Sequence, residues 1–152
     1  MRRRHFVLAS IITVGMLSPF AVQQAEARKP NTVTGSIPGE DRFAPFAVTV
    51  RVGDTVHWVN GDTDDHTVVT DKAFTTAGHD NVNRLIKGTA SPGGPGQLSL
   101  VFNHPGTFVY YCRFHAHLDA ANQPVAPGPE GGIADANGNF GTPMTGIVTV
   151  QD

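Results

Sequence analysis

The single cysteine of the chain lies in a short stretch that also carries two histidines. The stretch reads YYCRFHAH and contains Cys112, His115 and His117. A thiol close to imidazoles can bind a metal ion, act as a nucleophile, or be an unreactive core residue. Taken alone, Cys112 favours the unreactive core residue, because free cysteine is among the most buried residue types.

Two residues elsewhere in the chain change this interpretation. His66 follows a polar loop and opens an expected strand, and Met144 comes just before the last expected strand. Together with Cys112 and His115 they make a set of two imidazoles, one thiolate and one thioether. This set favours copper, because sulfur ligands are soft and imidazole suits both oxidation states. Zinc more often takes several cysteines, or histidines with carboxylates.

Enzymatic chemistry fits the same residues poorly. A Cys-His hydrolase needs an activated nucleophile and an oxyanion hole, and Cys112 with His115 at a strand end offers no such context. A binuclear copper centre with two bridging thiolates is excluded, because the chain has one cysteine. Multicopper enzymes need additional copper sites and more domains than one short chain can hold. We therefore expect that the protein is not an enzyme.

The N-terminal 27 residues have the composition of a secretory signal. Arg2 to Arg4 are basic, residues 6–17 are apolar, and Ala25 and Ala27 are small residues at the two positions that a signal peptidase reads. A membrane span needs about 20 apolar residues, so this run is short, although an uncleaved anchor is the alternative. We predict a removed signal at 1–27, a mature domain at 28–152 without a membrane span, and export, most simply to a bacterial periplasm.

Charge and cysteine usage agree with an exported binding protein. Without residues 1–27, eleven basic residues become eight and thirteen acidic residues become twelve, so the net charge moves from −2 to −4. A mildly acidic domain without a basic patch argues against nucleic-acid binding. One cysteine cannot form an internal disulfide, and a free thiol is a liability in an oxidising compartment. A thiolate bound to a metal ion needs no disulfide partner and is protected from oxidation.

The sequence predicts that short strands position the candidate ligands. Runs rich in valine, threonine and aromatic residues recur, cut by glycine and proline, and helical periodicity is lacking. The expected strands are 45–54 (with Phe46, Val48, Val50 and Val52 on one face), 55–60, 67–70, 98–102, 107–112 and 146–152. Residues 71–97 and 119–143 are expected to be irregular, and Asn137-Gly138 can close a small hairpin in the second. The pattern predicts one all-β domain, a β-sandwich.

Three segments carry a resemblance to a known family. GDTVHWVNGDTDDHTVV (53–69), HPGTFVYYCRFH (104–115) and MTGIVTV (144–150) are similar to segments of the cupredoxins, the small blue copper proteins. The resemblance implies a Greek-key β-sandwich or barrel with one type 1 copper ion. It also implies that His66, Cys112 and His115 are the equatorial ligands and Met144 the axial one.

The same resemblance implies a function. Proteins of this family carry single electrons between redox partners that dock transiently, and the second histidine ligand is the electron exit. Here that residue is His115, with Phe114 and Leu118 as the apolar docking patch. The residue after the first histidine often holds the cysteine sulfur, so we expect the backbone N–H of Thr67 to do so.

The sequence departs from the family pattern in the spacing of the methionine. In the family the methionine follows the second histidine after a few residues, whereas His115 and Met144 are 29 positions apart, and Leu118 stands at the short spacing. Either a long loop insertion returns Met144 to the copper, or Leu118 takes the axial place. We favour Met144, because MTGIVTV keeps the family context and loop closure costs only about 0.6 kcal/mol per doubling of length.

A second function stays open at this stage. The long ligand loop and the additional His117 can make bound copper labile, as a periplasmic protein for copper storage, delivery or sensing requires. His117 can also replace His115 as a ligand, add a second metal contact, or face solvent.

Overall fold

The computed structural model describes residues 28–126 and 142–152. The predicted signal at 1–27 and the predicted hairpin turn at Asn137-Gly138 lie outside these ranges. No helix in the described part of the chain is long and apolar enough to cross a membrane.

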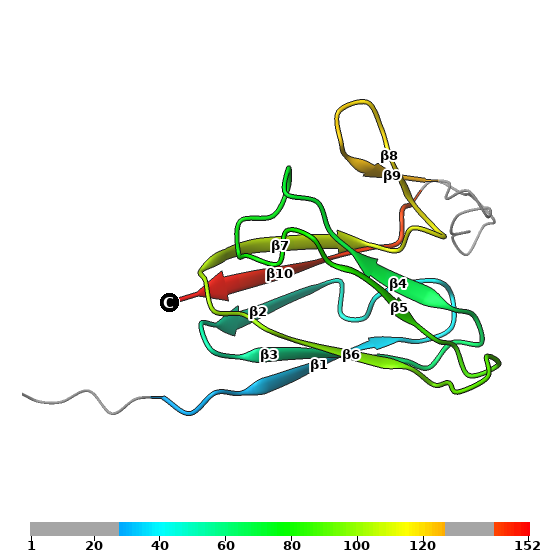
Figure 1. The fold of residues 1–152 in the computed structure, drawn as a ribbon, viewed down its shortest axis with the longest axis horizontal. Helices are drawn as coiled ribbons and strands as arrows, with labels where there is room; N and C mark the ends of the chain where they lie inside the picture. The colour runs from blue at the N-terminus through cyan, green and yellow to red at the C-terminus, as the bar shows by residue number, and fades with distance from the viewer. Residues whose placement is uncertain (1–27, 127–141) are drawn as a thin grey trace, which may run out of the picture.

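The described residues form ten β-strands (Figure 1). The strands are β1 (Thr32–Ile37), β2 (Ala47–Arg51), β3 (Thr55–Asn60), β4 (His66–Val69), β5 (Asn83–Ile86), β6 (Gln97–Val101), β7 (Gly106–Tyr111), β8 (His117–Leu118), β9 (Pro124–Val125) and β10 (Thr145–Gln151).

The strands build two main sheets and one small hairpin. One sheet has the order β1-β3-β6, the second has the order β2-β10-β7-β4-β5, and β8 pairs with β9. The chain passes repeatedly between the two main sheets, as in Greek-key sandwiches. The all-β prediction is therefore confirmed, with two open sheets in place of a closed barrel.

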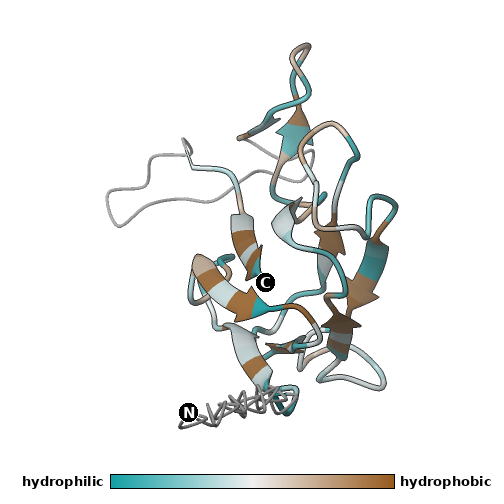
Figure 2. Cartoon of the chain, turned by 90° about the vertical axis from the view of Figure 1, so that its left-hand side faces the viewer, coloured by the Kyte–Doolittle hydropathy of each residue, from teal (hydrophilic) through white to brown (hydrophobic). Residues whose placement is uncertain are grey.

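The core lies between the two main sheets and follows from the two-residue period of the strands. In β3, Val56 and Trp58 are buried and alternate with half-buried residues, and in β7 Phe108 and Tyr110 do the same. Figure 2 shows the result as hydrophobic bands that alternate with paler ones along the strands. Alternation of this kind buries one face of each sheet against the other.

An aromatic cluster makes the part of the core that leads toward Cys112. The Trp58 and Tyr110 rings meet edge to face with centroids 5.3 Å apart, and Phe43 meets Tyr110 in the same way at 4.7 Å. The Trp58 Nε1–H donates a hydrogen bond to the Tyr110 hydroxyl at 3.1 Å. Because Tyr110 is two residues before Cys112, this packing gives the cysteine a rigid support.

Several strand predictions needed correction. β1 and β5 were not predicted, and β8 and β9 lie in regions expected to be irregular or unassigned. In the expected strand 45–54 only residues 47–51 pair, so Phe46 and Val52 lie beyond its ends and are 55% and 38% exposed. Alternation alone does not reveal where backbone pairing stops.

Candidate metal centre

Three neighbouring strands bring the predicted ligands to one end of the larger sheet. His66 opens β4, Cys112 directly follows β7, and Met144 directly precedes β10. β7 lies between β10 and β4, and both pairings are antiparallel. β10 therefore starts opposite the end of β7. β4 pairs with β7 at Val69 and Tyr111, so His66 lies beyond the end of β7, beside the turn that follows Cys112. The turn after β7 adds His115, whose N–H donates a hydrogen bond to the Cys112 carbonyl at 3.1 Å.

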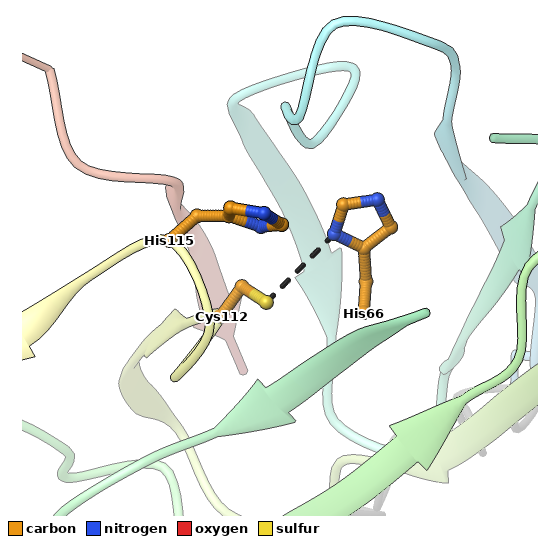
Figure 3. A group of neighbouring side chains, drawn as sticks. All are labelled: His66, Cys112 and His115. Atoms are coloured by element: carbon orange, nitrogen blue, oxygen red, sulfur yellow. Dashed lines mark hydrogen bonds between the residues drawn. The ribbon is translucent and has the colours of Figure 1, made fainter. Parts of the chain in front are cut away.

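His66, Cys112 and His115 form one compact cluster (Figure 3). One ligand atom from each residue lies within 4.8 Å of the others, and the two imidazole centroids are 5.0 Å apart. The His66 Nδ1 is 3.8 Å from the Cys112 Sγ. His66 and Cys112 are fully buried and His115 is 9% exposed. The site brings together the three residues that the sequence named as equatorial ligands.

One atom of this cluster has no hydrogen-bond partner. The His115 Nδ1 is the only buried side-chain N or O atom in residues 28–126 and 142–152 without one. A buried polar atom without a partner costs about 1 to 3 kcal/mol unless something else satisfies it. A metal ion bound between the thiolate and the two rings would satisfy it, so the donor set fits copper.

The Cys112 sulfur lies in surroundings that favour the thiolate. The Thr67 backbone N–H donates to the Sγ at 3.3 Å, as expected, and the Thr67 Oγ1 lies 3.6 Å from it. Burial raises the pKa of the Cys112 thiol, but the two imidazoles and Thr67 outweigh burial and lower it from 9.0 to about 6. Metal ligands must be deprotonated, so this lowering of the pKa favours metal binding near neutral pH.

The pKa values of the two histidines shift in the opposite direction to that of Cys112. Burial lowers the pKa of His66, but contacts with Cys112 and Asp62 raise it above its ordinary value. Contact with Cys112 also raises the pKa of His115. Each ring is thus stabilised in its positive form by the sulfur. The space between the three residues favours positive charge, which a metal cation supplies when it replaces the protons.

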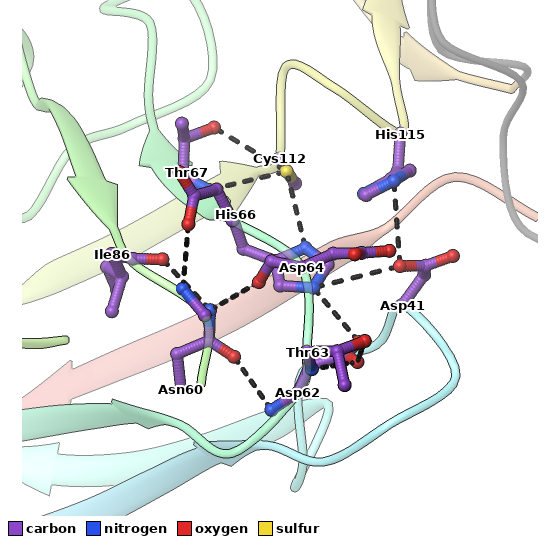
Figure 4. A network of polar contacts seen from close by, with 12 residues as sticks. Asp41, Asn60, Asp62, Thr63, Asp64, His66, Thr67, Ile86, Cys112 and His115 are labelled. Atoms are coloured by element: carbon purple, nitrogen blue, oxygen red, sulfur yellow. Dashed lines mark hydrogen bonds and ion pairs between the residues drawn. The ribbon is translucent and has the colours of Figure 1, made fainter. Parts of the chain in front are cut away.

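Two acidic residues complete the surroundings of the histidines (Figure 4). The Asp62 Oδ2 lies 3.1 Å from the His66 Nε2, and the Asp41 Oδ1 lies 3.5 Å from the His115 Nε2. Sequence reasoning missed both residues, because it assigned no role to Asp41 or to Asp62, which lies in the polar loop before His66. The four-residue spacing of Asp62 and His66 was a weak signal, whereas Asp41 comes from a distant segment and left none.

The structure distinguishes the surroundings of the two axial candidates. Met144 is buried, its carbonyl accepts a hydrogen bond from the Cys112 N–H at 3.0 Å, and its N–H donates to the His115 carbonyl at 3.4 Å. Leu118 is half-buried in β8, where it pairs with Pro124. Figure 1 shows that the β8–β9 hairpin projects from the end of the sandwich. The main chain of Met144 is therefore attached directly to two of the clustered residues.

Comparison with known proteins agrees with this geometry. Residues 31–121 match the family described as copper binding proteins, plastocyanin/azurin family. The chain is 29% identical over 117 residues to a plastocyanin of Synechococcus sp. (strain JA-2-3B'a(2-13)), covering 75% of this chain and 85% of that protein. It is also 29% identical over 118 residues to a plastocyanin of Nostoc punctiforme, covering 74% and 85%. The chain belongs to the plastocyanin/azurin family of copper-binding proteins.

Solved structures show the same fold. A Cu(I) amicyanin variant superposes with a TM-score of 0.51 at 21% identity, covering 79% of this chain and 82% of that one. An oxidised amicyanin variant gives 0.50 at 21% identity with the same coverage. The family match at 31–121 includes His66, Cys112 and His115 and ends before Met144. The resemblance to cupredoxins predicted from sequence is confirmed.

Proposed function

We propose that this protein is a blue copper electron carrier in which His66, Cys112 and His115 are the equatorial ligands of one type 1 copper ion and Met144 is the axial ligand. The observation that supports this most strongly is the buried Cys112 thiol of lowered pKa between two imidazoles. Bound copper supplies one-electron redox chemistry at this place. Membership of the plastocyanin/azurin family supports electron transfer over enzymatic catalysis.

The chain's own task is to hold one ligand arrangement in both oxidation states. β4, β7 and β10 are neighbours in one sheet, and the aromatic cluster behind Cys112 resists rearrangement. The Thr67 N–H holds the sulfur on one side. A rigid frame of this kind suits electron transfer, because ligands locked by packing and hydrogen bonds need little movement between states.

The electron leaves through His115. Its side chain is 11% exposed, whereas that of His66 is fully buried, so His115 is the ligand nearer the surface. Phe114 is half-buried beside it, with ring centroids 6.5 Å apart. We assign the transient docking of redox partner proteins to this end of the sandwich, with Phe114 and Leu118 as apolar contacts. Weak redox complexes use small interfaces of this kind.

Met144 supports the axial assignment through its backbone. Its two hydrogen bonds to Cys112 and His115 hold the residue at the cluster, and its side chain is buried. A thioether is a weak, long axial ligand in blue copper sites and helps to set their potential. Leu118 offers no ligand atom, so its presence over the copper would leave a three-coordinate centre.

The location follows the same proposal. We place the protein outside the cytoplasm, in a periplasm, on the strength of the N-terminal 27 residues with their basic, apolar and small-residue segments. The mature domain would then begin near Arg28. Western blotting of the fractionated source cell, together with N-terminal sequencing of the purified protein, tests both statements.

Copper loading tests the proposed function. The Cu(II) protein should show the intense visible thiolate-to-copper band and cycle reversibly between two oxidation states. Met144→Ala should change the potential and the spectrum, whereas Leu118→Ala should leave both unchanged. His115→Ala should abolish the colour, and His117→Ala is its matched control because His117 is exposed on β8. A colourless protein that releases copper readily would instead indicate storage or delivery.

A further inference from the structure

Each imidazole of the cluster has a carboxylate against its outer edge (Figure 4). The His66 Nε2 is 3.1 Å from the Asp62 Oδ2 and 3.7 Å from the Asp41 Oδ1. The same Asp41 oxygen is 3.5 Å from the His115 Nε2. The Asp41 carboxylate therefore contacts both rings, and the Asp62 carboxylate contacts only the more buried ring, that of His66.

In His66 the sulfur and the carboxylate lie at different ring nitrogens. The His66 Nδ1 lies 3.8 Å from the Cys112 Sγ while its Nε2 contacts Asp62. The His115 Nδ1 is buried without a hydrogen bond, and its Nε2 faces Asp41. Asp41 and Asp62 thus leave the Nδ1 atoms available to a metal ion. They also favour a proton on each Nε2, because only a protonated nitrogen can donate to a carboxylate.

Asp62 is held in place by its own loop. Its Oδ1 accepts the Thr63 N–H at 2.6 Å, which leaves Oδ2 for His66. The Asp62 N–H donates to the Asn60 side chain at 2.9 Å, and Asn60 is fully buried. Asp62 itself is 9% exposed. A carboxylate fixed and desolvated in this way acts on its neighbour through little intervening water.

Asp41 is held in place by a strained turn. Glu40 and Asp41 have φ angles of 84° and 49°, two consecutive non-glycine residues in the left-handed region. Such backbone strain persists only where the surroundings impose it, and it concentrates at functional sites. Here two hydrogen bonds of 2.8 Å between Ser36 and Ala44 close the turn, and the buried Phe43 anchors it against Tyr110. The turn places Asp41 over both rings.

We propose that Asp62 and Asp41 are positioning residues that fix the ring orientation of His66 and His115 and lower the reduction potential of the centre. The inference rests on the proposed blue copper function. A carboxylate on the outer nitrogen makes an imidazole ligand more basic. A more basic ligand and a nearby negative charge both favour Cu(II) over Cu(I), because the oxidised ion carries one more positive charge.

The test compares midpoint potentials of copper-loaded variants. Asp62→Asn should raise the Cu(I):Cu(II) ratio at a fixed applied potential about tenfold, which is about 59 mV for one electron. Asp41→Asn should raise it by a smaller factor, because its side chain is 30% exposed and its contacts are longer. Asp64→Asn is the matched control, since it removes the same charge from an exposed residue of the same loop.

A second measurement separates positioning from charge alone. In the diamagnetic Cu(I) protein, the Nε2–H protons of His66 and His115 should exchange slowly with solvent, and Asp62→Ala should speed exchange at His66 only. Equal potential shifts in Asp62→Asn and Asp64→Asn, or no shift in Asp62→Asn and Asp41→Asn, would overturn the inference. If wild type forms no blue centre, the proposed function has failed instead. Should Asp62→Asn not fold, Asp41→Asn still decides, because Asp41 is the more exposed of the two carboxylates.

Discussion

Replacing Thr67 by valine tests how the protein holds the cysteine sulfur. The Thr67 Oγ1 contacts the Cys112 Sγ at 3.6 Å and accepts the Arg113 N–H at 2.9 Å. Valine keeps the shape of the side chain and the backbone N–H that donates to the sulfur, but removes the hydroxyl. Two interactions are therefore lost without a cavity.

The two losses have separate magnitudes. The Arg113 amide loses its acceptor, which costs about 1 to 2 kcal/mol of unfolding free energy, toward the lower end for an amide on an exposed residue. The sulfur loses a weak donor, worth about 0.5 to 1 kcal/mol to the more negative, reduced centre, which corresponds to a potential about 20 to 40 mV lower. We thus expect lower stability and a lower potential together.

Chemical unfolding of the copper-free protein and voltammetry of the copper protein measure these effects. Thr70→Val is the matched control: the Thr70 Oγ1 donates to the Val109 carbonyl at 2.7 Å without contacting the sulfur. The Thr70→Val variant should lose stability and keep its potential. Thr67→Ser should restore the potential, because it keeps the hydroxyl, while the loss of a buried methyl group lowers its stability. An unchanged or higher potential in Thr67→Val would refute the assignment of the hydroxyl to the sulfur.

Three further predictions concern the frame around the centre. Hydrogen bonds from the backbone N–H groups of Arg51 and then Asn31 lower the pKa of Asp54 to about 2. The stabilising contribution of the Asp54 carboxylate is therefore present above about pH 3.8 and is lost as the pH falls through 2. In acid unfolding, the stability of Asp54→Asn should depend less steeply on pH in this window than that of wild type. Burial raises the pKa of Tyr110 to about 12, so the native state should lose stability as the pH rises from about 10 to 12. Alkaline unfolding measures this loss, and the slope of stability against pH should differ between wild type and Tyr110→Phe only in this range. Gly146→Ala would place a Cβ within 2.9 Å of three Tyr110 side-chain atoms, so thermal melting should show a clearly lower Tm, and an unchanged Tm would contradict this packing.

The ligand strands could be predicted from sequence because local pattern and chemistry agreed. The alternation in 107–112 matches the buried residues of β7, which carries the chain to Cys112. The alternation in 55–60 matches the buried residues of β3, which leads into the loop before His66. His66 and Cys112 stand at strand ends, and His115 follows in the turn after β7, where side chains of a sandwich converge. The role of Met144 stays a prediction, supported by its backbone contacts.

The missed features depend on tertiary contacts. β1 contains Gly35, which lowers strand propensity, but a Cβ there would lie 3.2 Å from the Trp58 ring, so the glycine permits close packing. β5 has a single buried residue, Ile86, and therefore shows no alternation. Asp41 reaches the two histidines through a turn whose φ angles no local sequence pattern indicated. These features follow from where distant segments meet.

The two backbone hydrogen bonds of Met144 allow the ligand loop, which leads to Met144, to vary in length. They join the two ends of the segment 116–143 by main-chain contacts, which depend on no side chain within it. The part of the segment that follows β9 can therefore be exchanged for a longer or shorter one, while the sheet still delivers the same ligands and β8 keeps Leu118. For protein engineering, the part of the loop between β9 and Met144 is a natural insertion point, where a sensor peptide or a partner-binding module can be joined within a few residues of a redox centre.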